Sequence, residues 1–161
     1  MIVQLRLDER LIHGQVTTAW SRFLNVSGIV VVSDKLSKDK LATQTLLMSA
    51  PAGKKVAVKS VEDGIKLLQD PRGVAMRMLV IVDNPKDAVT LVKALPEIEE
   101  INCANYVKKK SANKVKIATG VTADPEDLAH FKELVQVGKC VFAQLIPSQA
   151  REDIAAILAK L

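Results

Sequence analysis

Residues 6–16 of the chain read RLDERLIHGQV and stand between an apolar stretch and a helix-like pattern. The apolar run at 2–5 predicts a first strand, and residues 15–24 predict a helix with positions 16, 19, 20 and 23 on one face. We expect Trp20, the only tryptophan, to anchor that helix in the core. Segment 6–16 is therefore a strand-to-helix crossing. Ligands of open α/β sheets bind at the carboxyl ends of strands, so we expect the functional site here.

The rest of the chain alternates between expected strands and expected helices. The run at 28–32 is entirely apolar, which is typical of a strand buried on both faces. Asn84-Pro85 and Asp124-Pro125 are start signals for two of the helices. Further strands are expected at residues 55–58, 76–82, 98–102, 115–118 and 140–143. This alternation predicts an α/β fold of a single domain over residues 1–161, with about seven mostly parallel strands and helices on both faces.

Composition and short motifs exclude several classes of protein. The net charge of +5 is compatible with a nucleic-acid partner, but aromatic residues make up only 3 % of the chain, so stacking platforms are scarce and we expect no nucleic acid. No run approaches the ~20 apolar residues of a membrane span, and a secretory signal is not expected. Cys103 and Cys140 lack the CxxC spacing of a zinc cluster. The sequence also lacks the GxGxxG, P-loop and GxSxG motifs.

His13 is the first candidate for chemistry in segment 6–16. It precedes Gly14 at the expected start of the helix, where unpaired backbone N–H groups favour an anion. A neutral imidazole has a lone pair near pH 7 and acts as a nucleophile. The residues alone leave a functional histidine and a hydrogen-bonded turn histidine both open. His130, the other histidine, is expected on the solvent side of its helix, opposite the apolar stripe.

The polar residues around His13 allow more than one interpretation. Arg10, three residues earlier, either holds phosphoryl oxygens in a two-pronged grip or pairs with a neighbouring carboxylate. Asp8 either orients Arg10 or accepts an N–H from His13 and fixes its tautomer. Gly14 lets a phosphate approach the backbone closely. Gln15 either donates its side-chain amide to the phosphate or only starts the helix.

Segment 6–16 resembles the active-site loop of the IIB subunits of the mannose/fructose/sorbose class of the bacterial phosphotransferase system (PTS). The resemblance covers nearly the whole chain, through residues 25–27, 30–34, 101–102 and 142–147. In that family the histidine carries a phosphoryl group from the IIA subunit to an incoming sugar. The resemblance implies that His13 is the phosphohistidine intermediate and that Asp8 and Arg10 are the other catalytic residues. It also implies that Arg10, Gly14 and Gln15 bind the phosphate.

The resemblance implies the partners of the reaction as well. The donor is a phosphorylated IIA domain, and the acceptor is a sugar held by the membrane IIC/IID permease. Mannose-type hexoses, fructose, sorbose and N-acetylgalactosamine all remain open as the sugar. We expect no cofactor, no metal, and a cytoplasmic protein that associates peripherally with the permease. A homodimer is left open, and the alternative function is a non-catalytic nucleotide- or partner-binding α/β module.

The loop after the fifth expected strand departs from the family pattern. The family usually has a glycine pair there, whereas this chain has NCAN at residues 102–105. Asparagine tolerates the left-handed backbone conformation, so we expect the turn at Asn105. The three lysines at 108–110 follow. They form either a solvated loop or a docking rim for an acidic partner.

Overall fold

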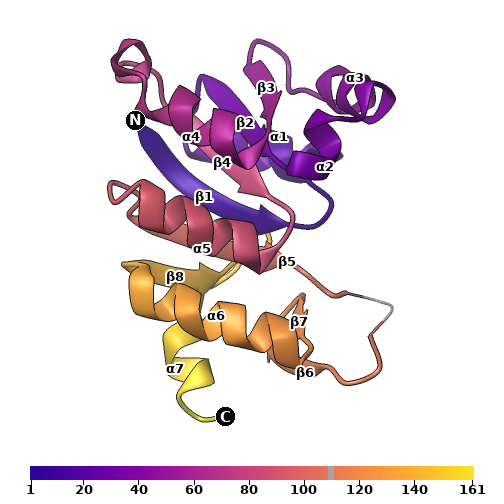
Figure 1. Cartoon of the computed structure of the whole chain (residues 1–161), viewed down its shortest axis with the longest axis vertical. Helices are drawn as coiled ribbons and strands as arrows, with labels where there is room; N and C mark the ends of the chain where they lie inside the picture. The colour runs from indigo at the N-terminus through magenta and orange to yellow at the C-terminus, as the bar shows by residue number, and fades with distance from the viewer. Residues whose placement is uncertain (109–110) are drawn as a thin grey trace.

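The computed structural model describes residues 1–108 and 111–161, which form a central sheet with helices on both faces (Figure 1). The described residues give a seven-stranded sheet in the order β3-β2-β4-β1-β5-β8-β9. Neighbouring strands are parallel except for β8 and β9. The strands are β1 (Ile2–Asp8), β2 (Gly28–Val32), β3 (Lys55–Lys59), β4 (Met78–Val82), β5 (Glu100–Asn105), β8 (Cys140–Ala143) and β9 (Glu152–Asp153). The predicted fold class is confirmed.

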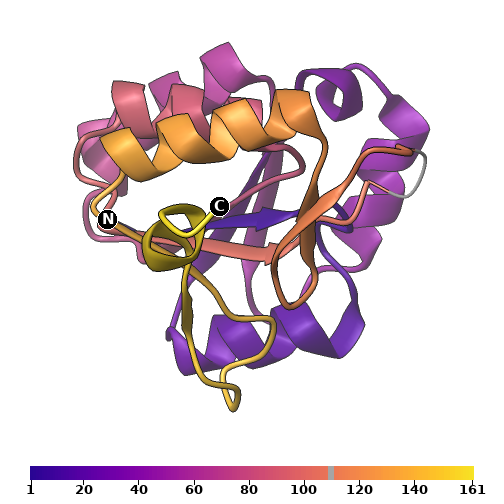
Figure 2. The same cartoon turned by 90° about the horizontal axis from the view of Figure 1, so that it is seen from below.

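The helices form a layer on each face of the sheet. In Figure 2 the layer with α4, α5 and α6 lies above the sheet, and α1 lies below it. The helices are α1 (Gly14–Phe23), α2 (Asp34–Ser37), α3 (Lys40–Met48), α4 (Val61–Gln69), α5 (Pro85–Ala94), α6 (Pro125–Val137) and α7 (Ile154–Leu158), with a 3-10 turn at Pro71–Gly73.

The strand expected at 115–118 is the exception to the predicted sheet. It forms β6 (Val115–Ala118), which pairs antiparallel with β7 (Val121–Ala123) in a separate hairpin. Gly120, with φ +76°, makes the tight turn between them. The seventh place in the sheet belongs to β9, a two-residue strand that was not predicted. A short apolar run shows that a strand forms but not which sheet it joins, because pairing depends on the turn that follows.

The sheet separates two hydrophobic cores. Leu5 and Leu7 face the layer of α5 and α6 and belong to its hydrophobic cluster. Trp20 of α1 packs against the opposite face with Ile29 and Ile81, and no part of it is exposed. The expectation that Trp20 anchors its helix is confirmed.

The inner face of α1 differs from the predicted one. Phe23 is 60 % exposed and Ala19 is exposed, whereas Thr17 and Ser21 are buried beside Trp20. With the large indole of Trp20 in the core, α1 is rotated so that Thr17 and Ser21 also face inward. Both hydroxyls tolerate burial because they form hydrogen bonds. Thr17 accepts the backbone N–H of His13, and Ser21 donates to a carbonyl in its own helix.

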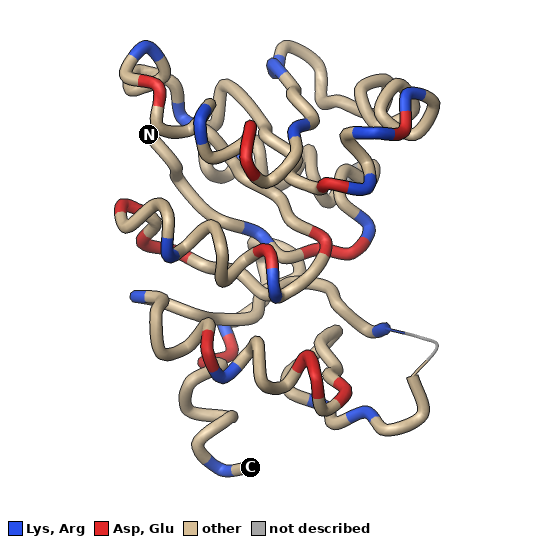
Figure 3. The backbone as a smooth tube through the Cα atoms, in the orientation of Figure 1, with Lys and Arg blue, Asp and Glu red and all other residues tan. Residues whose placement is uncertain are grey.

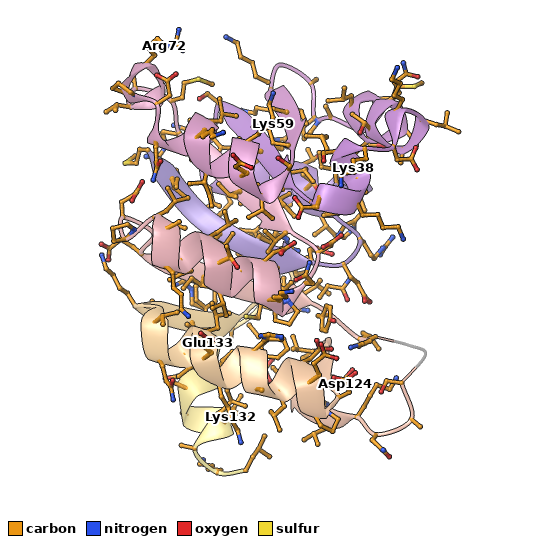
Figure 4. The ribbon with its side chains drawn as sticks, viewed as in Figure 1. Lys38, Lys59, Arg72, Asp124, Lys132 and Glu133 are labelled. Atoms are coloured by element: carbon orange, nitrogen blue, oxygen red, sulfur yellow. The ribbon has the colours of Figure 1, made fainter. Side chains whose placement is uncertain are left out.

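The start signals of α5 and α6 work as predicted. The Asn84 side chain accepts the backbone N–H of Asp87 at 2.8 Å, and the Asp124 side chain accepts that of Asp127 at 2.9 Å. The two helices lie side by side and are joined by an ion pair between Lys93 and Glu133. Figure 4 shows Glu133 on the side of α6 that faces α5.

The order of the strands creates a switch point beside β1. After β1 the chain passes through α1 on one face to β2, on one side of the sheet. After β5, the neighbour of β1, it passes through α6 on the other face to β8, on the opposite side. The two connections diverge, so the carboxyl ends of β1 and β5 bound a crevice of the kind in which α/β proteins bind ligands.

Candidate active site

The loop after β1 is held by its apolar residues. The chain turns at once, because the backbone N–H of Leu11 donates to the carbonyl of Asp8 at 3.0 Å. Leu11 has φ +58°, a conformation that costs a residue other than glycine about 1 kcal/mol. Leu11 and Ile12 are both buried in the cluster around Trp20, and this burial offsets the strain. The loop therefore has a fixed shape.

Asp8 is the centre of the site and is fully buried. Its Oδ2 lies 2.8 Å from Nε2 of His13 and 3.0 Å from Nη2 of Arg6. Its Oδ1 accepts the backbone N–H of Arg10 at 3.0 Å and the side-chain amide of Asn105 at 3.4 Å. Asp8 and His13 are therefore joined through Nε2 of the imidazole ring. Asp8 was expected either to orient Arg10 or to contact His13, and in the structure its side chain contacts the ring of His13.

Arg10 is exposed. Its backbone N–H is bound by Asp8, but its side chain forms no ion pair among residues 1–108 and 111–161. The suggested pairing of Arg10 with Asp8 or Glu9 is absent from the described structure. The Asp8 carboxylate contacts Arg6 and His13, and the Glu9 carboxylate accepts backbone N–H groups of the segment after β5. An exposed guanidinium beside the loop is available to an anion.

His13 stands at the N-terminus of α1, with 11 % of its side chain exposed. The helix has no acidic residue in its first turn, and no side chain caps it in the described structure. Gly14 is exposed with φ +52°, and a Cβ there would meet nothing within 4 Å. Glycine is thus required by the backbone conformation rather than by lack of space. Gln15 lies in the first turn of α1, but its side chain is outside the part that the structure describes.

The segment after β5 forms the second wall of the site. The backbone N–H of Glu9 donates to the carbonyl of Asn105 at 2.9 Å, and the Glu9 carboxylate accepts the backbone N–H of Val107 at 3.2 Å. Residues 102–105 all belong to β5, so the turn expected at Asn105 is wrong. The left-handed residue is Lys108, with φ +47°. A shift in register lets β5 continue to Asn105, which pairs with Asp8.

Lys108 forms ion pairs with two carboxylates at the start of α6. Its Nζ lies 2.6 Å from Asp124 and 2.9 Å from Asp127. Figure 4 shows Asp124 at the start of α6. These carboxylates raise the pKa of Lys108, and Lys108 lowers the pKa of Asp124. Lys109 and Lys110 lie outside the described residues. In Figure 3 basic and acidic positions are interspersed along the tube.

Arg6 belongs to the site but was not predicted to do so. Its side chain is 2 % exposed, and both Nε and Nη2 donate to Oδ2 of Asp8. Burial lowers the pKa of the Arg6 guanidinium, and the contact with Asp8 acts in the opposite direction. The signal was present, because residues i and i+2 of a strand share a face. Gln4, Arg6 and Asp8 form a buried polar row on β1.

The described part of the chain carries no cluster that would hold a metal and no helix that would span a membrane. Groups of three or more His, Cys, Asp or Glu side chains at ligand distance are absent from it. None of its helices is long and apolar enough to cross a bilayer. His130 lies on α6, partly buried, and is not among the residues gathered around Asp8.

The fold is an open α/β sheet, and its site places a buried carboxylate in contact with a histidine at a helix N-terminus. Residues 2–161 match the family described as the PTS system sorbose subfamily IIB component. The chain belongs to this family of phosphotransferase subunits, which transfer phosphoryl groups in bacterial sugar uptake. Family members work together with IIA and IIC/IID components.

Individual relatives agree with the family assignment. A probable phosphotransferase enzyme IIB component from Streptococcus pyogenes is 40 % identical over 162 residues, which cover 98 % of this chain and 99 % of the relative. The crystal structure of the IIB domain of the sorbose permease from Klebsiella pneumoniae has a TM-score of 0.90 at 29 % identity, covering 99 % of this chain and 97 % of that one. The mannose-specific EIIAB component of Escherichia coli strain K12 is 33 % identical over 135 residues, or 83 % of this chain and 41 % of that protein.

Proposed function

We propose that His13 carries the phosphoryl group and that Nδ1 is the atom that accepts it. The observation that supports this most directly is the 2.8 Å contact between Nε2 of His13 and Asp8. With its proton on Nε2, the neutral ring has its lone pair on Nδ1. Asp8 is thus an orienting residue, in the way that a buried aspartate fixes the tautomer of a catalytic histidine in hydrolases.

The transfer has two displacement steps. In the first, the lone pair of Nδ1 of His13 forms a bond to the phosphorus of the phosphorylated IIA domain, and the donor atom leaves with the electron pair of its broken bond. In the second, a hydroxyl oxygen of the sugar bonds to phosphorus and the electron pair of the Nδ1–phosphorus bond returns to the ring. The hydroxyl proton passes to a base or to water.

The phosphoryl oxygens are proposed to bind around the start of α1. The exposed guanidinium of Arg10 supplies a planar fork for two oxygens. The uncapped first turn of the helix supplies backbone N–H donors and the positive end of its dipole. Gly14 gives the backbone the conformation that this turn needs. The Gln15 amide is proposed as a further donor.

The proposed partners follow from the family. A phosphorylated IIA domain docks on the face that carries His13, and the sugar is presented by the IIC/IID permease. The IIB unit is proposed to span residues 1–161 and to work at the cytoplasmic side of the membrane, in contact with the permease. The relatives are named for sorbose, fructose and mannose, and each of these sugars is compatible with the proposal.

The proposal is tested by labelling with a phosphorylated IIA domain and mapping the labelled peptide. We expect one phosphoryl group per chain, on His13, which is lost in acid and kept in base as a phosphoramidate is. His13→Ala takes up no label, and His130→Ala, on α6, behaves as the parent protein. Label that survives acid, or that remains in His13→Ala, contradicts the proposal.

A further inference from the structure

The buried guanidinium of Arg6 shares one carboxylate oxygen with His13. Its Nε and Nη2 lie 3.2 and 3.0 Å from Oδ2 of Asp8, the same atom that lies 2.8 Å from Nε2 of His13. Arg6 and Asp8 are 2 % and 0 % exposed. Solvent therefore does little to screen the carboxylate, and its charge is balanced by the groups that touch it.

The Arg6 side chain also contacts the Trp20 ring of α1 and the carbonyl of Leu145. Nη2 also donates to the carbonyl of Leu145 at 3.3 Å, and the guanidinium lies 5.4 Å from the centre of the Trp20 ring. The indole Nε1 donates to the same carbonyl at 2.7 Å. Contacts from β1, from Trp20 of α1 and from the carbonyl of Leu145 thus converge on one buried cation.

We propose that Arg6 is a positioning residue, whose fixed charge neutralises Asp8 so that Asp8 holds His13 as the neutral Nε2–H tautomer with Nδ1 free. This inference rests on His13 being the phosphoryl carrier. Without the guanidinium, the imidazole would be the only charge partner left for a buried carboxylate. Protonation of both ring nitrogens would then be favoured, and an imidazolium has no lone pair with which to attack phosphorus.

Arg6 and Arg10 therefore have separate tasks. Arg6 is buried and contacts Asp8, and Arg10 is exposed and faces the incoming phosphoryl group in the proposed function. Loss of Arg6 should alter the histidine before any donor is present. Loss of Arg10 should alter only the transfer.

The test is the nitrogen NMR spectrum of the His13 ring at pH 7 in protein labelled with ¹⁵N-histidine, together with the rate of transfer from phosphorylated IIA. The parent protein is expected to carry its proton on Nε2. Arg6→Gln is expected to lose this single tautomer and to transfer about 10²-fold more slowly. Arg6→Lys, which keeps the charge but not the fork, should keep a neutral ring and recover part of the rate.

Two control variants separate this role from general damage. Arg10→Gln should transfer poorly with the tautomer of the parent protein. Arg151→Gln, which breaks an ion pair with Glu100 away from His13, should change neither measurement. Circular dichroism establishes which variants fold. If Arg6→Gln does not fold, the inference is tested by the ¹⁵N spectra of the parent protein and of Arg6→Lys.

Three results would overturn the inference. They are a parent ring with its proton on Nδ1, an Arg6→Gln protein that keeps the Nε2–H tautomer whatever its rate, and an imidazolium in Arg6→Lys. The spectrum needs no donor, so failure of the inference is distinguishable from failure of the proposed function. If His13 takes no label, the proposed function is wrong whatever the tautomer.

Discussion

The carboxylate of Glu9 accepts the backbone N–H of Val107 at 3.2 Å and so joins the loop after β1 to the segment after β5. We expect Glu9→Ala to lower the free energy of unfolding by about 1 kcal/mol, because it leaves two backbone donors, at 107 and 108, without their acceptor. Urea denaturation measures the change. Glu97, an exposed acid before the start of β5, is the control: the free energy of unfolding of Glu97→Ala should stay within about 0.5 kcal/mol of the parent value. An equal loss of stability in both variants would refute the role of Glu9.

Arg10→Lys should keep the fold and lose phosphoryl transfer by about tenfold or more, because an ammonium does not reproduce the two parallel donors of a guanidinium. The thermal midpoint and the transfer rate are measured on the same samples. Arg72→Lys is the matched control, since Arg72 is exposed in the turn after α4 and pairs only with Asp70 in the described structure (Figure 4). Near-normal transfer by Arg10→Lys would exclude a two-pronged grip.

Gly14→Ala and Gly53→Ala form a matched pair. Both glycines have positive φ, at +52° and +75°, and both have open space where a Cβ would stand. Each substitution should cost about 1 kcal/mol of stability through backbone strain alone. Only Gly14→Ala should slow the transfer, because Gly53 lies in the turn before β3. Equal transfer rates in the two variants would show that the conformation of Gly14 does not serve the site.

Lys108→Met should destabilise the protein at neutral pH by removing the partner of Asp124 and Asp127. Lys108 lowers the pKa of Asp124 below its ordinary value of 3.8, so the stabilisation is present above that value and is lost as the pH falls through the folded-state pKa. The difference between parent and variant in urea midpoint should therefore shrink below about pH 3.8. A difference that stays constant from pH 7 to pH 2 would assign the effect to packing instead.

Local sequence was enough to predict most of the elements. The apolar run at 28–32 and the Asn84-Pro85 start signal each appear where expected, because burial on both faces and helix capping depend on a few neighbouring residues. The strand β6 was predicted, but its pairing with β7 in a separate hairpin was not, and neither was the short β9. Their pairing depends on where the chain goes next, and no periodicity within four residues records that.

The candidate site divides in the same way. The sequence by itself determined that a histidine, Gly14 and Arg10 follow a strand and open a helix, because these are neighbours in one continuous segment. Only the tertiary structure decided that Asp8 contacts His13 rather than the side chain of Arg10, and that Arg6 and Asn105 converge on the same carboxylate. The physical reason is that these contacts form where β5, α1 and the segment at Leu145 meet the end of β1. A charge buried there is shielded from water, so it is stabilised only by the groups that the fold brings next to it.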